Sequence, residues 1–316
     1  MQRLALFVCF SLFASFVVPV RGSQFEEGSL VTTQGTIEFK VYVPSSYSGD
    51  PVPLVVVLHG GAQDADMIAA GTRWNDLAEA EGFIVLYPEQ SLLRNEKMCW
   101  NWFFEADQHR GYGEPFLIAE ATGYVMRRYN IDRSMVYICG MSAGAAMATI
   151  VAVCYPDMFA AVGSHSGLEY RAADSVNSAY SAMASGGPDP DVTAEAAYME
   201  ILRAGTQRSS LPAVVFHGTD DEIVNIVNGN QTAEQFVILN EALGRILERT
   251  ESEGFEGKPY TVTSYVREGE TMVEYWTVEG LGHAWSGGST DGGQYNDPEA
   301  PEATLHMWDF FKRHPL

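Results

Sequence analysis

The chain has 316 residues and a formal net charge of −22 at neutral pH, with 41 acidic against 19 basic side chains. This length holds one large domain or two small ones. A strongly acidic surface repels nucleic-acid phosphates and anionic lipids, so the composition excludes nucleic acid as an expected partner.

The first 22 residues have the pattern of a secretory signal peptide. Arg3 precedes an apolar run over 4–20, and small residues stand at its end. We predict cleavage after Gly22, which leaves 23–316 as an exported chain, extracellular or periplasmic. The alternative is an uncleaved anchor, because the run is near the lower length limit of a membrane span. No later stretch is apolar enough to cross a membrane, so no stable membrane association is expected after cleavage.

Beyond this segment, apolar β-rich runs alternate with helical stretches. This alternation predicts an α/β fold with a mostly parallel central sheet and helices on both faces. No linker rich in Pro, Gly or Ser is visible, so 23–316 is predicted to form a single domain. The predicted order is strand 36–44, strand 53–58, helix 74–81, strand 83–87, helix 114–129, strand 135–139, helix 143–154, strand 159–164, a loop and candidate lid segment 181–191, strand 213–216, helix 231–249, strands 260–267 and 272–278, and helix 304–313.

A Gly-x-Ser-x-Gly motif at 140–144 joins a predicted strand to a predicted helix. Such a sharp turn holds the serine hydroxyl above the sheet, and the flanking glycines let the strand and helix pack closely. We therefore predict that Ser142 is a nucleophile and that the backbone N–H of Ala143 stabilises an oxyanion. The alternative is a tight turn that carries an ordinary surface serine.

A nucleophile of this kind needs an acid and then a histidine later in the chain. His283 follows the last predicted strand pair in a Gly-rich loop, where its ring can reach Ser142 as the general base. Asp220 and Asp221 both follow the strand 213–216. Asp221 is preferred because it fits a His-Gly-x-x-Asp-x-x-Val spacing. The alternative role for either carboxylate is to cap a turn.

A second oxyanion donor is expected from the loop after an early strand, Leu58-His-Gly-Gly-Ala62. Glycine at this place lets a backbone N–H turn toward the serine. Gly61 is the predicted donor and Ala62 the second choice, while His59 is expected to brace the loop.

Three tryptophans are predicted to bind substrate. Trp100 and Trp102 stand in an aromatic cluster, and Trp285 follows His283 by two positions. For Trp100 and Trp102 the alternative is packing in the core, while Trp285 has the better claim to line the pocket.

These segments together resemble the esterase family of polyhydroxybutyrate (PHB) depolymerases and their feruloyl and acetylxylan esterase relatives. The resemblance runs from about residue 32 to 311. It implies the α/β-hydrolase fold, with Ser142, Asp221 and His283 as the triad. The shared marks are Leu58-His-Gly, Gly71-Thr-Arg-Trp-Asn75, Gly82-Phe-Ile-Val-Leu-Tyr-Pro-Glu-Gln90, Cys99-Trp-Asn-Trp102, Gly140-Met-Ser-Ala-Gly144, His165-Ser-Gly167 and Gly282-His-Ala-Trp285.

The chain departs from the family pattern at one cysteine. Members often carry Cys directly after the His-Gly, paired with the Cys of Cys-Trp-Asn-Trp, and Gly61 stands there in this chain. The resemblance therefore implies that Cys99 lacks that partner and that the oxyanion loop lacks a tether. The odd number of cysteines left after export, namely Cys99, Cys139 and Cys154, allows one disulfide at most within a monomer.

A second departure concerns polymer binding. Extracellular PHB depolymerases of this family usually add a separate substrate-binding domain, for which 23–316 has no room after the closing helix. We therefore expect soluble or amorphous substrates rather than crystalline polymer.

The sequence thus predicts a secreted serine esterase that works through an acyl-enzyme. Its expected substrate is a polyhydroxybutyrate or 3-hydroxyalkanoate polyester or oligomer, and the alternative is a feruloyl or acetyl ester on plant polysaccharide. No metal or other cofactor is expected, since no Cys-x-x-Cys pair or His/Cys cluster is present. Two readings from other classes are a binding module that keeps the fold without the chemistry and a peptidase with the same triad.

Overall fold

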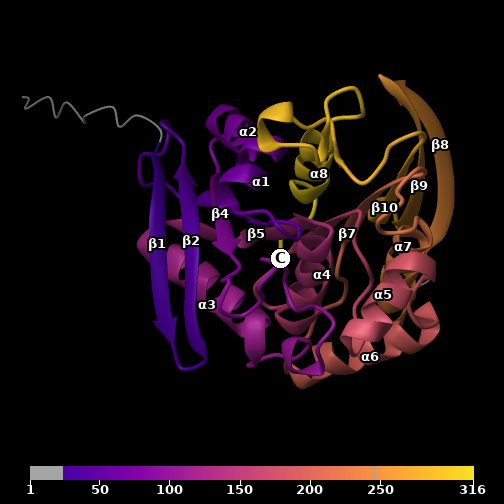
Figure 1. The fold of residues 1–316 in the computed structure, drawn as a ribbon, viewed down its shortest axis with the longest axis horizontal. Helices are drawn as coiled ribbons and strands as arrows, with labels where there is room; N and C mark the ends of the chain where they lie inside the picture. The colour runs from indigo at the N-terminus through magenta and orange to yellow at the C-terminus, as the bar shows by residue number, and fades with distance from the viewer. Residues whose placement is uncertain (1–23, 245–246) are drawn as a thin grey trace, which may run out of the picture.

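The protein is described by a computed structural model over residues 24–244 and 247–316. The predicted signal peptide, 1–22, lies outside the described residues. A ten-stranded sheet in the order β1-β2-β4-β3-β5-β6-β7-β10-β9-β8 crosses the molecule from side to side (Figure 1). The strands are β1 Gln24–Thr32, β2 Gly35–Val43, β3 Val52–Leu58, β4 Ile84–Glu89, β5 Ile131–Met141, β6 Ala161–His165, β7 Ala213–Gly218, β8 Glu248–Glu256, β9 Lys258–Arg267 and β10 Glu270–Val278, with a separate short pair β11 Trp285–Ser286 and β12 Asn296–Asp297.

The centre of the sheet is parallel and its two flanks are antiparallel. All neighbours from β4 through β10 run parallel. β1 and β2 pair antiparallel on one flank, and β9 and β8 do so on the other. The central strands are mostly buried because helices cover both of their faces, although β5 has the polar residues Asp132 to Ser134 near its start. The predicted α/β class with a mostly parallel central sheet is confirmed.

Two layers of helices sandwich the sheet (Figure 1). α1, α2 and α8 cover one face, and α3 to α7 cover the other, so a separate apolar cluster forms on each side. Among the described residues, no helix is both long enough and apolar enough to span a membrane. The helices are α1 Ala65–Thr72, α2 Trp74–Glu81, α3 Gly113–Arg128, α4 Ala143–Cys154, α5 Val176–Ser185, α6 Pro190–Arg203, α7 Val227–Leu243 and α8 Ala303–Phe311, with short 3₁₀ turns at Glu105–Asp107 and Thr290–Gly292.

The predicted helix over 231–249 is wrong at its C-terminal end. α7 ends at Leu243, and the chain then enters strand β8, whose nine residues all pair with β9. β8 reads Glu-Arg-Thr-Glu-Ser-Glu-Gly-Phe-Glu and is exposed almost throughout. An edge strand with charges on both faces has no apolar alternation, so the sequence pattern carries no strand signal there.

The predicted loop over 181–191 is also wrong over most of its length. α5 runs to Ser185 and α6 begins at Pro190, which leaves only four residues between them. Ser175 caps α5 through a reciprocal capping box with Ser178. Because this helix is rich in Ala and Ser, its sequence has no clear apolar periodicity that would predict a helix. Its N-terminal cap and its packing stabilise it.

Candidate active site

Ser142 occupies a strained turn between β5 and α4. Its backbone has φ 55° and ψ −122°, which a non-glycine residue adopts only under constraint. A Cβ on Gly144 would lie 2.2 Å from the Leu58 carbonyl oxygen, and one on Gly140 would lie 2.5 Å from the Gly144 carbonyl. The two motif glycines are therefore required for the close approach of β3, β5 and α4, which lifts Ser142 above the sheet.

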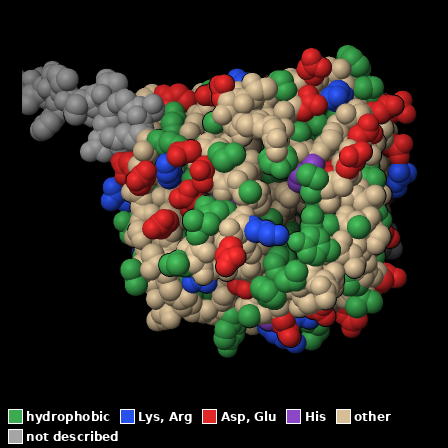
Figure 2. Space-filling model, viewed as in Figure 1, with side chains coloured by type: hydrophobic (Ala, Val, Ile, Leu, Met, Phe, Trp, Pro, Cys, Tyr) green, Lys and Arg blue, Asp and Glu red, His purple; other side chains and the backbone are tan. Residues whose placement is uncertain are grey.

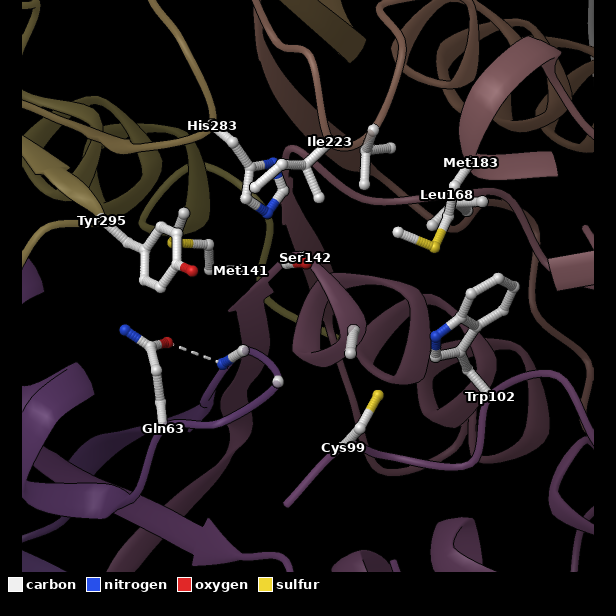
Figure 3. Close-up of a pocket in the computed structure, with 14 residues that line it drawn as sticks. Gln63, Cys99, Trp102, Met141, Ser142, Leu168, Met183, Ile223, His283 and Tyr295 are labelled. Carbon is white, nitrogen blue, oxygen red and sulfur yellow. Dashed lines mark hydrogen bonds between the residues drawn. The ribbon is translucent and has the colours of Figure 1, made fainter. Parts of the chain in front are cut away.

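The loop after β3 leaves one backbone donor free beside Ser142. The N–H of Gly60 donates to Gln63 Oε1 at 2.9 Å (Figure 3), and the N–H of Ala62 donates to the Lys97 carbonyl at 2.9 Å. A Cβ on Gly60 would lie 3.6 Å from the Cβ of Ser142, so this loop passes directly over the serine. Gly61, and not the second choice Ala62, therefore has the N–H that can face a substrate.

His59 orients this free N–H. Nε2 of His59 accepts from the N–H of Gln90 at 3.0 Å, so Nδ1 carries the proton and donates to the Gly60 carbonyl at 2.8 Å. The C=O of Gly60 and the N–H of Gly61 belong to one trans peptide and point in opposite directions. Burial lowers the pKa of His59 to about 4, which keeps its ring neutral and this arrangement intact at neutral pH. The second donor candidate, the N–H of Ala143, stands at the start of α4, where helix N–H groups lack intrahelical partners.

The structure brings Asp221 and His283 together. Nδ1 of His283 lies 2.7 Å from Oδ2 of Asp221, and the other nitrogen of the His283 ring faces Ser142 (Figure 3). Asp220, in contrast, is exposed and accepts a hydrogen bond from its neighbour Thr219. The geometry therefore favours Asp221 over Asp220 as the partner of the histidine.

Several donors hold the Asp221 carboxylate. Oδ1 accepts from the N–H of Val224 at 2.8 Å and from that of Ile223 at 3.0 Å, and Nε2 of His217 lies 3.4 Å from Oδ2. Burial acts to raise the pKa of Asp221, but hydrogen bonds from His217 and His283 outweigh it and hold the pKa well below its usual range. Asp221 is thus an anion that can stabilise a protonated His283.

Further contacts hold the loop that carries His283, here called the histidine loop, against the rest of the site. The N–H of Asp220 donates to the Leu281 carbonyl at 3.0 Å, which joins the acid and histidine loops. His165 is fully buried and accepts from the N–H of Ser286 at 3.0 Å, while its carbonyl accepts from the N–H of Ser142 at 2.9 Å. Burial lowers the pKa of His165 to about 3, so its ring is neutral at pH 7. His165 thereby links the turn at Ser142 to the histidine loop.

A pocket of about 190 Å³ opens over these groups. Gln63 and Tyr295 stand on one side of Ser142, and Cys99, Trp102 and Met183 stand on the other (Figure 3). The sequence singled out neither Tyr295 nor Met183, because one lies in a loop far along the chain and the other in the unpredicted α5. The full lining is Gly60, Gly61, Gln63, Cys99, Trp102, Met141, Ser142, Ala143, Leu168, Met183, Ile223, Val224, His283 and Tyr295.

Two of the three predicted substrate-binding tryptophans are not in this lining, which corrects the prediction. Trp285 is 0% exposed and donates from its indole to Thr304 of α8 at 3.0 Å. Trp100 is 1% exposed and donates to the His59 carbonyl at 3.0 Å, so it supports the oxyanion loop from behind. Both indoles bury their ring area and satisfy their N–H inside the protein. Trp102 alone of the three reaches the pocket.

The sheet order, the elbow and the three converging side chains define a protein of the α/β-hydrolase fold. Among solved structures, an acetyl xylan esterase from Aspergillus awamori superposes with a TM-score of 0.71 over 91% of this chain and 99% of that one, at 19% identity. A feruloyl esterase module from Clostridium thermocellum superposes with a TM-score of 0.57 over 93% of this chain and 88% of that one, at 14% identity. At these identities the likeness establishes the fold alone.

Sequence comparison identifies the family. A family profile described as esterase PHB depolymerase matches residues 37–256, and the chain belongs to this family. A poly(3-hydroxyalkanoate) depolymerase C from Paucimonas lemoignei is 34% identical over 255 residues, which are 80% of this chain and 59% of that relative. A probable acetylxylan esterase A from Aspergillus flavus is 28% identical over 225 residues, which are 70% of this chain and 72% of the relative. The chain thus spans less than two thirds of the length of the depolymerase that it matches.

Proposed function

We propose that the protein is an exported serine esterase that hydrolyses aliphatic hydroxyacid polyesters or their oligomers. The observation that carries the proposal is the 2.7 Å contact between Asp221 and His283, whose free nitrogen is directed at Ser142 on a strained elbow. A serine, a histidine and an acid in this relation form the arrangement that activates a hydroxyl for acyl transfer.

In this proposal Ser142 attacks the ester carbonyl carbon while Nε2 of His283 takes the hydroxyl proton. The N–H groups of Gly61 and Ala143 bind the oxygen that becomes negative, and Asp221 stabilises the imidazolium. His283 then gives its proton to the leaving alcohol oxygen as the carbon–oxygen bond breaks. A water molecule, deprotonated by His283, attacks the acyl-enzyme and releases the acid, and the proton returns to Ser142.

The polyester assignment is supported by the relative named poly(3-hydroxyalkanoate) depolymerase C and by the apolar side of the pocket, formed by Leu168, Met183 and Trp102. An aliphatic acyl group gains affinity from burial against such side chains. The signal-like segment 1–22 supports export, and the acidic charge speaks against a nucleic-acid partner.

The second candidate is an acetyl or feruloyl esterase that acts on plant polysaccharide. It is supported by the relatives named acetylxylan esterase A and by the small catalytic pocket, which also suits a two-carbon acyl group.

The deciding experiment compares the purified mature protein on a 3-hydroxybutyrate oligomer, acetylated xylan and methyl ferulate, with Ser142→Ala as the blank. The proposal expects the oligomer to be cleaved with the highest kcat/KM. A preference for acetylated xylan or methyl ferulate assigns the second candidate instead. If none exceeds the blank, a peptidase substrate or a non-catalytic binding role must replace both.

A further inference from the structure

We propose that a groove beside the catalytic pocket binds the acyl-side chain of an extended aliphatic ester, beyond the unit that Ser142 attacks. This proposal rests on the proposed function and names the part of the substrate that the enzyme recognises. We call the site the acyl groove. Its large apolar side chains are Trp102, Phe103, Phe104, Val176, Tyr180 and Met183, and the rest of its lining is Cys99, Ala179 and the polar residues Arg94, Asn95, Glu96, Lys97 and Asn101. It has a volume of about 440 Å³.

One wall of the acyl groove is a single face of α5. Val176, Tyr180 and Met183 recur at helical spacing, so all three side chains project from the same side of the helix. Tyr180 is 59% exposed, which leaves much of its apolar surface in contact with water. This face stays apolar although the chain as a whole is strongly acidic, which is the expected property of a binding surface.

The opposite wall is an aromatic loop held rigidly in place. Trp102, Phe103 and Phe104 follow one another with ring centroids 5.4 and 4.7 Å apart. The backbone of Asn101 donates to the buried carboxylate of Glu114, and Gln108 donates to the Trp102 carbonyl at 2.8 Å. The backbone of Asn101 and Trp102 therefore does not have to be ordered when a ligand binds, which lowers the entropic cost of binding.

The acyl groove continues directly from the catalytic pocket. Trp102, Met183 and Cys99 line both hollows. In Figure 3 these three residues lie across Ser142 from Tyr295, and in Figure 2 hydrophobic side chains gather beside the hollow on this face. The leaving oxygen must approach His283 to receive its proton. The chain that runs the other way, toward Trp102, is then the acyl part of the ester.

The volumes favour a repeating aliphatic chain as the occupant. A 3-hydroxybutyrate unit has six heavy atoms and fills roughly 100 Å³ at protein packing density. The catalytic pocket of about 190 Å³ has room for at most about two such units, so a longer acyl chain extends beyond it, and the acyl groove is the hollow that adjoins it. An acetyl group would not reach the acyl groove at all. Lys97, whose Nζ lies 3.5 Å from the Tyr180 hydroxyl, supplies a donor for the ester carbonyls that recur along such a chain.

The test uses p-nitrophenyl esters of one, two and three linked 3-hydroxybutyrate units, with p-nitrophenyl ferulate beside them. The leaving group is constant, so only the acyl side changes. For the unaltered enzyme, kcat/KM is expected to rise about tenfold or more from one unit to three, as added apolar contacts allow. Tyr180→Ser and Phe104→Ser should each remove most of this rise. Phe255→Ser is the matched control, because its ring is 70% exposed on β8 and outside the acyl groove.

Two results would overturn the acyl groove. One is cleavage of the one-unit ester with no gain on chain extension. The other is a ferulate ester that exceeds the three-unit ester and alone depends on Tyr180 and Phe104, which makes the occupant an aromatic acyl group. If none of the three 3-hydroxybutyrate esters is cleaved above the Ser142→Ala blank, the proposed function itself is wrong, and the acyl groove proposal is wrong with it.

Discussion

At the scale of single residues, the acid of the proposed triad gives the sharpest test. Asp221 and Asp220 are adjacent and chemically identical, yet only Asp221 contacts His283, at 2.7 Å. Asp221→Asn is expected to lower kcat by about 10³- to 10⁴-fold, because the amide no longer favours the productive histidine tautomer. Asp220→Asn should stay within about threefold of the unaltered enzyme, as a change in an exposed side chain usually does. Steady-state hydrolysis of a small ester measures both, and a larger loss in Asp220→Asn would contradict the assignment.

Gly61 and Cys99 offer a second residue-level prediction. A Cβ on Gly61 would lie 3.7 Å from the Cβ of Cys99, within the range that disulfides require. Cys99 is a free thiol. Gly61→Cys should therefore form a disulfide under oxidising conditions and raise the free energy of unfolding by roughly 4 kcal/mol for a loop of about 40 residues.

Denaturant unfolding with and without reductant measures this gain, and mass spectrometry confirms the bond. Gly61→Ser is the control without a thiol. Cys139 and Cys154 stay free in either case, so a Gly61→Cys protein in which the introduced thiol and Cys99 both remain reduced after oxidation would contradict the placement of the two loops.

Residue-level prediction from sequence agrees with the geometry where a motif sets the local structure. The elbow spacing placed Ser142, and the His-Gly-x-x-Asp spacing pointed to the aspartate that the structure brings to His283. The same approach placed Trp285 in the pocket only because it is near His283 in the chain. Its burial depends on Thr304 in α8, a contact that no local pattern encodes.

At the scale of elements, the aromatic loop is anchored to α3 by one buried carboxyl. Glu114 accepts from the backbone and side chain of Asn101, each at 2.6 Å. Burial, together with the nearby Asp107, raises the pKa of Glu114 from 4.5 to about 7. The folded protein thus binds this proton more tightly than the unfolded chain does. The stabilisation it contributes is complete below pH 4.5 and is lost as pH rises to about 7, on the order of 3 kcal/mol.

Glu114→Gln is therefore expected to flatten the fall in the free energy of unfolding between pH 4.5 and 7. Glu120→Gln, a change on the same helix, is the control and should keep the slope of the unaltered protein. Denaturant titrations across this pH range supply the measurement. Equal slopes in the Glu114→Gln and unaltered proteins would mean that Glu114 does not take up a proton in this range.

Elements were predicted well where burial imposes a pattern and poorly where it does not. Strands β3 and β5 and helix α4 are apolar because other layers cover them, and their positions follow from composition. β8 is exposed and charged, and α5 is built largely from Ala and Ser, so neither has a strong periodic signal. The acyl groove could not be predicted, since one of its walls is the helix that the sequence failed to reveal.

At the scale of the whole molecule, the net charge of −22 should affect which substrates approach the site. A free-acid oligomer carries a carboxylate that the acidic surface repels, while its methyl-capped equivalent is neutral. We expect kcat/KM for the free acid to rise several-fold as salt increases from about 0.01 to 0.5 M, as charge screening predicts. The capped oligomer should change little. An equal response of both substrates would mean that long-range repulsion does not limit binding.

The proposed catalytic site as a whole depends on segments that are far apart in the chain. Gln63, Trp102, Leu168, Val224 and Tyr295 meet in one pocket because the central strands all end at the same edge of the sheet. The order serine, acid, histidine predicts that such a convergence exists. It does not predict which other loops complete the pocket, because that depends on loop packing.

The most direct test of the account is covalent labelling of the mature protein with a fluorophosphonate, followed by peptide mass spectrometry. We expect one adduct, on Ser142, that forms quickly in the unaltered protein and much more slowly in His283→Ala and Asp221→Asn. No adduct, or an adduct on another serine, would contradict the claim that Ser142, His283 and Asp221 act together as the catalytic centre.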